Sequence, residues 1–280
     1  MWRSLGSVRP LEPADRAWAL DVCAQDPISN VFVAARIVES GLSGARPVAY
    51  GYDHGGQESV CWASANIVPA SAGPAALAAF AGKVMKRRRT ASSVFGPADQ
   101  VQDLWSKLGP AWEPRREYRR AQPVMTIGPG ELPATAPTDE QVRPATLADL
   151  DAVVPAAAAM FTEEIGYPPY RGSDQTYRRG VASLITRGHT LIRTDHGKVV
   201  FKADLGSVAL GVAQIQGVWL APHLRGQGLA PAAMAAVVRY AQAHVAPTVT
   251  LYVNDYNSAA IATYRRVGFQ QTGTFATILL

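Results

Sequence analysis

Hydrophobic residues recur with helical spacing just after a glycine-containing turn in the second half of the chain. Met234, Val237, Val238 and Ala241 fall at positions i, i+3, i+4 and i+7, which predicts one buried face of a helix. The run before the turn, VALGVAQIQGVW (208–219), is rich in β-branched residues and predicts a buried strand. The segment RGQG therefore lies in a strand-to-helix turn.

This turn has the features of an anion site. Pro231 suits the first turn of a helix, because its missing N–H costs nothing there. Gly226 and Gly228 have no Cβ, so a ligand can approach the backbone closely. A turn that opens a helix also directs several N–H groups and the positive end of the helix dipole at one spot. The sequence indicates a phosphate site here, with plain chain reversal as the alternative.

Strands and helices alternate on both sides of the turn. The pattern predicts helices at 147–161, 175–185 and 257–267, a hairpin of strands 189–194 and 199–204, a strand at 248–253, and a last strand at 273–280 that closes this half. Such an order is typical of an α/β (α+β) fold around one mixed sheet.

The chain divides into near-equal halves that begin alike. The segment GPGELPATAPTDEQVRP (128–144) is rich in Pro, Gly and Thr and indicates a linker. VRPLEPAD (8–15) and VRPATLAD (142–149) agree at five of eight positions, which favours a duplicated domain. We therefore expect a first domain at residues 1–127, a linker at 128–141 and a second domain at 142–280.

The first half lacks the polar chemistry of the second. Its segment SSVFGPADQVQDLWSKLGP predicts a strand and a helix that ends at Gly109, with Trp105 where the second half has Tyr264. NIVPASAGPAALAAF (66–80) occupies the place of the glycine turn but lacks an Arg-x-x-Gly-x-Ala pattern. The first half is thus expected to share the fold without the site.

Composition describes a soluble globular protein. Of 280 residues, 48% are hydrophobic and 18% charged, and the net charge of +5 favours an anionic ligand but is too small to indicate nucleic acid. The basic run KVMKRRR (83–89) is typical of a solvated helix end.

The cysteines and the N-terminal residues predict the cellular compartment of the protein. Cys23 and Cys61 form no disulfide framework and have no metal-ligand spacing, which predicts a reducing compartment and no metal. The N-terminal residues 1–15 lack the apolar core of a signal peptide, and no apolar run is long enough to span a membrane. We expect a cytoplasmic protein with no membrane or nucleic-acid partner; its oligomeric state stays open.

Two motifs in the second half carry a family resemblance. The first is Arg or Gln, two residues, Gly, one residue, then Gly or Ala; the second is an Asn followed by Ala, Tyr and Gly-Phe. Their residues here are Arg225, Gly228 and Ala230, and Asn257, Ala260, Tyr264, Gly268 and Phe269. With them the second half resembles the GNAT superfamily of acetyl-CoA-dependent N-acetyltransferases. The whole chain resembles its tandem form, known from actinobacterial proteins, in which a degenerate, uncharacterised GNAT-like half precedes an intact one.

The resemblance implies roles for named residues. Acetyl-CoA would be the co-substrate, and Tyr264 would protonate the departing CoA thiolate, which a phenol near the sulfur can do. Asn257 would bond the cofactor arm. The backbone would bind the pantetheine arm through Val218, Trp219 and Leu220, and the pyrophosphate through the turn residues Arg225, Gly226, Gln227, Gly228, Leu229 and Ala230.

The sequence departs from the family pattern at the general base. Many family members carry a glutamate on the long strand, where this chain has Gln214 and Gln216. An amide cannot accept the proton at neutral pH, so Glu163 and Glu164 at the end of the preceding helix are the best candidates. Weaker candidates are Asp204, His189 and His223.

The expected function is transfer of an acetyl or other short acyl group to a primary amine of a small molecule or a protein. Two alternatives stay open. One is a non-catalytic, acyl-CoA-binding regulatory module, which the missing strand carboxylate favours and Tyr264 disfavours. The other is a tandem acyltransferase similar to mycothiol synthases.

Overall fold

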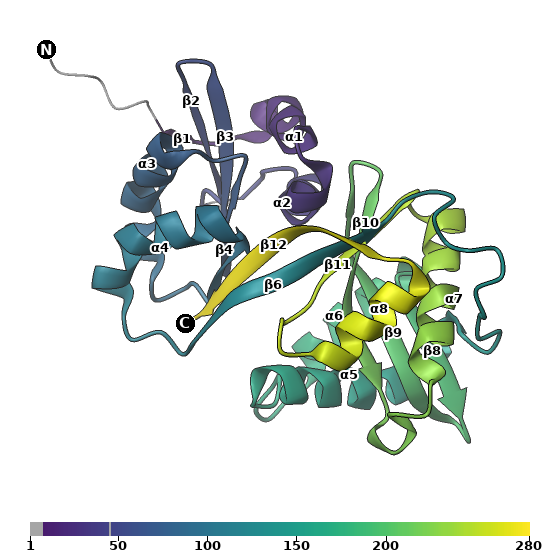
Figure 1. The fold of residues 1–280 in the computed structure, drawn as a ribbon. Coiled ribbons are helices and arrows are strands. Elements are labelled where there is room, and N and C mark those ends of the chain that lie inside the picture. Colours follow the sequence, from purple (N-terminus) through teal and green to yellow (C-terminus); the bar gives the residue numbers. More distant parts are fainter. Residues whose placement is uncertain (1–7, 45) are drawn as a thin grey trace, which may run out of the picture.

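A computed structural model describes residues 8–44 and 46–280. The N-terminal segment 1–15 is predicted to contain no signal peptide, and its first seven residues lie outside the described residues. Within the described part of the chain, twelve strands form one mixed sheet in the order β1-β2-β3-β4-β5-β12-β6-β11-β10-β9-β8-β7. Two lobes stand side by side, and the long strands β6 and β12 run between them (Figure 1). The predicted α/β fold with a mixed sheet is confirmed.

Both halves contain the same elements in the same order: a strand, two helices, three strands, a helix, a strand, a helix and a strand. The first half comprises β1 (Val8–Pro10), α1 (Arg16–Ala24), α2 (Pro27–Ser40), β2 (Ala49–His54), β3 (Gln57–Ala63), β4 (Asn66–Ala70), α3 (Pro74–Val84), β5 (Ser93–Pro97), α4 (Ala98–Trp112) and β6 (Glu117–Ile127). The second comprises β7 (Arg143–Pro144), α5 (Leu150–Ile165), α6 (Gln175–Thr186), β8 (Thr190–Asp195), β9 (Lys198–Ala209), β10 (Val212–Leu220), α7 (Leu229–His244), β11 (Thr248–Tyr252), α8 (Ser258–Val267) and β12 (Gln270–Leu279).

An ion pair explains why the two halves begin with similar sequences. The guanidinium of Arg9 donates two hydrogen bonds of 2.6 Å to the carboxylate of Asp15, and Arg143 donates two of 2.8 Å to Asp149. In both copies the aspartate also accepts the backbone N–H three residues before it. These arginine bonds are the main reason that the pKa of each carboxyl lies below its usual range. The repeated residues thus fix the same entry into the first helix.

The two halves exchange their last strands. β12 lies between β5 and β6, and β6 lies between β12 and β11, so the final strand of each half pairs with the penultimate strand of the other. The expectation that residues 273–280 close their own half is therefore wrong. The domain limits at 127 and 142 stay a prediction.

The exchanged strands complete the core of the opposite half. Ala276 and Ile278 of β12 are buried with residues of α3 and α4, whereas Met125 and Ile127 of β6 are buried with residues of α7 and α8. Burying a side chain as large as those of Ile278, Met125 and Ile127 stabilises a fold by about 1.5–3 kcal/mol. Apolar burial across the middle of the sheet therefore ties the two halves together.

Helix α4 is longer than the sequence predicts. It continues past Gly109 and Pro110 to Trp112, whose indole is fully buried and donates to the carbonyl of Met85. Burial of this side chain outweighs the two residues that usually end a helix. The other expected elements of the second half agree with the structure to within a few residues, apart from the strand before the turn, which divides at Leu210–Gly211 into β9 and β10.

Cys23 and Cys61 are both buried, and neither forms a disulfide. Burial raises the pKa of each thiol to about 12. Within residues 8–44 and 46–280, no helix is both long and apolar enough to cross a membrane. The same residues contain no group of three or more His, Cys, Asp or Glu side chains placed to hold a metal ion.

The strand exchange predicts that the second half does not fold by itself. A fragment of residues 142–280 would expose the hydrogen-bonding edge of β11, which favours aggregation. A fragment of residues 113–280 keeps β6 and should show a cooperative thermal transition by circular dichroism, whereas 142–280 should show none. Equal melting temperatures of the two fragments would contradict this account.

Candidate active site

A cleft opens where two parallel strands separate. β10 and β11 pair only where Val212–Gln214 faces Thr248–Thr250. Beyond these residues β10 stays with β9 and β11 stays with β6, because each has a full antiparallel partner on its other side. The cavity that the separation leaves has a volume of about 540 Å³. A stretch of strand edge from Gly217 to Leu220 lines it and is free to bind an extended ligand.

A bulge shapes the wall that β10 contributes. The pairing of β10 with β9 shifts register between Gln216 and Trp219, and Gly217 has a φ of 59° there. The ammonium of Lys202, which is almost completely buried, donates to the Gly217 carbonyl at 3.2 Å and also pairs with the carboxylate of Asp204. This buried pair holds the bulge from the side of β9.

The glycine turn presents free amides at the end of the cleft. Gly226 and Gly228 have φ values of 75° and 77°, which other residues adopt only with strain. In the described part of the chain, no backbone acceptor bonds the N–H groups of Gly226, Gln227 or Gly228. Helix α7 begins at the next residue, so its positive dipole end adds to them. This arrangement fits a phosphate group.

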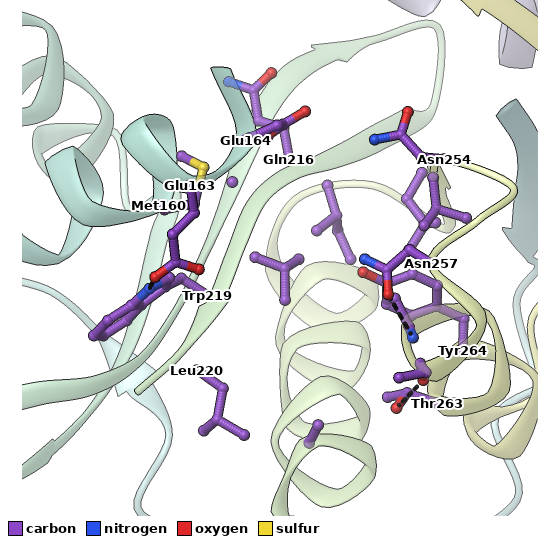
Figure 2. A pocket seen from close by; sticks show the side chains of 18 of the residues that line it. Met160, Glu163, Glu164, Gln216, Trp219, Leu220, Asn254, Asn257, Thr263 and Tyr264 are labelled. Carbon is purple, nitrogen blue, oxygen red and sulfur yellow. Dashed lines mark hydrogen bonds between the residues drawn. The ribbon is translucent and has the colours of Figure 1, made fainter. Parts of the chain in front are cut away.

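Arg225 does not point freely into solvent. Its Nε donates to the Leu220 carbonyl at 2.9 Å, and its Nη2 donates to Glu163 at 2.7 Å. The other oxygen of Glu163 accepts the indole N–H of Trp219 at 3.1 Å (Figure 2). Both oxygens of Glu163 are therefore engaged, and its carboxylate ties α5 to the start of the turn.

Asn257 and Tyr264 line the side of the cleft opposite Glu163 and Trp219 (Figure 2). Asn257 caps helix α8, because its Oδ1 accepts the N–H of Ala260 at 3.2 Å. The side-chain nitrogen of Asn257, Nδ2, forms no hydrogen bond to a described residue and can donate to a ligand. Burial, helped by the negative charge of Glu164, raises the pKa of Tyr264 to about 12, so the phenol keeps its proton at neutral pH.

Glu164 is held at the cleft by the first half of the chain. Arg119 of β6, itself buried, donates to the Glu164 carboxylate at 3.3 Å and to its backbone carbonyl at 2.9 Å. The Glu164 side chain is half-exposed and lines the cavity. Its second carboxylate oxygen accepts no hydrogen bond from a described residue.

The other polar candidates lie at different depths. Gln216 lines the cleft, whereas Gln214 is buried within the sheet. Asp204 lies opposite Gln216 on β9. His189 is half-buried, which lowers its pKa, and His223 lies on the surface; neither lines the cleft.

A chain of polar side chains at the cleft has no local signal in the sequence. Gln122 of β6 donates to Asn254, which follows β11, at 2.8 Å and accepts from Thr277 of β12 at 2.6 Å. Gln122 and Asn254 both line the cavity. Because these residues come from three distant segments, only the strand exchange brings them together.

The matching positions in the first half are occupied by protein groups. The turn between β4 and α3 has its Ala72 N–H bonded to the side chain of Gln100 at 3.2 Å. Trp105, at the position that corresponds to Tyr264, packs in the core of α3 and α4. An amide that is free in the second half is thus satisfied internally in the first.

Two family models match parts of the chain. Residues 159–269 match the model of the Acetyltransferase (GNAT) family, and residues 48–153 match a domain of unknown function, DUF4081. Among curated protein sequences, none matches the chain.

Solved structures share the fold over nearly the whole chain. A GCN5-related N-acetyltransferase from Sphaerobacter thermophilus is 18% identical with a TM-score of 0.64, covering 99% of this chain and 96% of that one. A GNAT-family acetyltransferase from Colwellia psychrerythraea is 14% identical with a TM-score of 0.55, covering 98% and 99%. A tandem GNAT protein from the clavulanic acid biosynthesis pathway is 13% identical with a TM-score of 0.56, covering 97% of each chain.

The geometry of the turn predicts the effect of a bulky residue at Gly228. Gly228→Val places a β-branched side chain at a φ of 77° and beside the free amides, so CoA affinity should fall by more than roughly 100-fold. Isothermal titration calorimetry of the wild type should show one CoA site per chain. Gly82→Ala, on α3, is the matched control and should bind normally; two equivalent sites, or a Gly228→Val protein with normal affinity, would contradict the assignment.

Proposed function

We propose that the chain is, through residues 159–269, a member of the GNAT acetyltransferase family and that it transfers an acetyl or other short acyl group from CoA to a primary amine. One observation carries the proposal: the cleft between β10 and β11 has free amides for phosphate at one end and a protonated phenol, Tyr264, in its wall. A pantetheine arm along the edge of β10 would lie between these two features.

The proposed reaction is direct attack of the amine on the thioester. The amine nitrogen bonds the acyl carbon, and the tetrahedral intermediate then expels the CoA sulfur. Tyr264 donates its proton to this thiolate, which leaves as the thiol. The amine loses one proton in forming the amide, so a base or water must accept it. The high pKa of Tyr264 suits an acid that stays protonated until the sulfur leaves.

Of the two proposed bases, Glu164 is the better placed. Glu163 already accepts hydrogen bonds from Trp219 and Arg225 through its two oxygens. Glu164 lines the same cavity with one carboxylate oxygen unengaged by the described residues, and Arg119 fixes its position. We therefore assign Glu163 to positioning Arg225 and Glu164 to proton acceptance, directly or through water.

We propose a small-molecule or protein amine as the acceptor and the cytoplasm as the location. The two unpaired, buried thiols support a reducing compartment. No nucleic-acid or membrane partner is needed for this reaction, and the mild net charge of +5 suits an anionic cofactor.

Tyr264→Phe should separate acid catalysis from binding. The substitution keeps the buried ring but removes the proton, so turnover should fall by roughly 10²–10⁴-fold while CoA affinity stays nearly unchanged. Thiol release from acetyl-CoA with a panel of primary amines measures turnover, and calorimetry measures affinity. Trp105→Phe is the matched control, expected to change melting temperature alone; a fully active Tyr264→Phe enzyme would end the catalytic assignment.

Glu164→Gln and Glu163→Gln should behave differently in a pH profile. Loss of the base should lower kcat and remove the acidic limb of the profile in Glu164→Gln. Glu163→Gln should mainly weaken CoA binding and keep the limb, because Arg225 loses its charged partner. Should both variants keep the wild-type pH dependence, the base is elsewhere or absent.

A further inference from the structure

A second cavity adjoins the cleft and is walled partly by the first half. Its volume is about 810 Å³, and it shares Met160 and Gln216 with the cleft. The wall from the second half consists of α5, α6, the loop before α6, and β9. The wall from the first half is α2, which packs against β9 and contributes Arg36 and Glu39. A ligand in this cavity would approach the bulge of β10 from the side away from the glycine turn.

Three charged residues form a cluster at one end of this cavity. Glu39 accepts from Arg36 at 2.9 Å and from Arg187, at the end of α6, at 2.7 Å. One carboxylate thus serves two guanidinium groups, which leaves one positive charge unbalanced within the cluster.

The donors of this cluster also outnumber its acceptors. The two terminal nitrogens of Arg36 donate to Glu39 and to the Gly206 carbonyl. Its Nε is buried and has no acceptor among the described residues. Arg187 bonds Glu39 through Nη1 alone in the described part of the chain. A single carboxylate from a ligand would match the spare charge and the remaining terminal N–H groups of Arg187, whereas the Nε of Arg36 is buried.

The other end of the cavity is polar and lies beside the cleft. Its carboxylate, that of Asp204, already pairs with Lys202 and accepts a hydrogen bond from Thr190. Asp204 lines the cavity on β9, directly opposite Gln216 in the pairing with β10. Gly206 is on the same face of β9, two residues further along, and its carbonyl accepts from Arg36 at 3.2 Å. Two residues of strand span roughly 7 Å, so about that distance along β9 separates Asp204 from the residue whose carbonyl Arg36 contacts.

The wall between the two ends is largely apolar and aromatic. The rings of Tyr170 and Tyr177 lie 5.6 Å apart at this cavity, and Met160, Ala157 and Leu184 add aliphatic surface. Such a wall suits the methylene stem of a flexible ligand.

From these contacts we infer that the acceptor is an amine that also carries a carboxylate, with a short apolar stem between the two groups. The carboxylate binds Arg36 and Arg187, and the amine lies at Gln216, beside the thioester. This inference rests on the proposed acyl transfer for the identity of the amine as acceptor, but the cavity recognises the carboxylate whatever the chemistry. It gives the first half a role in acceptor selection through α2.

Calorimetry with a matched pair of probes tests the inference. 5-Aminopentanoate and pentylamine have the same amine and stem, and only the first has a carboxylate. Each is titrated into the full-length protein, with and without saturating CoA. The wild type should bind 5-aminopentanoate about fivefold to tenfold more tightly than pentylamine, the range for one partly exposed charged contact.

Three variants separate carboxylate recognition from damage to the contact between the halves. Arg36→Gln and Arg187→Gln should each reduce the advantage of 5-aminopentanoate, whereas Glu39→Gln should increase it, because it removes the competing carboxylate. A purely structural cluster would weaken binding of both probes in all three variants. Arg179→Gln, exposed elsewhere on α6, is the control and should keep the wild-type ratio.

The outcomes distinguish this inference from the proposed function. Equal affinity for the two probes, or a ratio that Arg36→Gln, Arg187→Gln and Glu39→Gln leave unchanged, overturns carboxylate recognition even if CoA binds. Absence of CoA binding overturns the proposed function, while a probe ratio that follows the predicted changes without CoA still supports the carboxylate site.

Discussion

The separation of β10 from β11 is the constraint on which the site depends. Each of these parallel strands follows its antiparallel neighbour, β9 or β6, once their own three residue pairs end. The bulge at Gly217, held by the buried Lys202, keeps them apart on one side. A cleft with an unpaired strand edge and the start of α7 at its end is the result. Both the phosphate site and the position of Tyr264 follow from it.

Strand exchange makes the first half part of this site. β6 is the neighbour that holds β11 in place, and it carries Arg119 to Glu164 and Gln122 to Asn254. Helix α2 adds Arg36 to the adjoining cavity. The first half, whose own turn has the Ala72 amide bonded to Gln100, therefore contributes residues to the cleft of the other half. Loss of the first half would remove positioning groups as well as stability.

Local signals were readable from the sequence, and long-range contacts were not. Gly228 at a positive φ and Asn257 as a helix cap follow from nearby residues, so the turn and α8 were predicted correctly. The strand exchange depends on which edges meet in three dimensions, and the hydrophobic pattern of 273–280 fits either partner. For the same reason the sequence could not show that Arg119 contacts Glu164 across 45 positions. Glu163 was proposed as a base, but its bond to Arg225 depends on the fold.

Hydrogen exchange with and without CoA reads the backbone amides that we propose bind the phosphate. We expect slower exchange on CoA binding at residues 215–230 and 254–264, with the largest effect at Gly226, Gln227 and Gly228. Residues 66–74, the corresponding turn of the first half, should be unaffected. Protection of that first-half turn, or none at Gly226 to Gly228, would contradict the account.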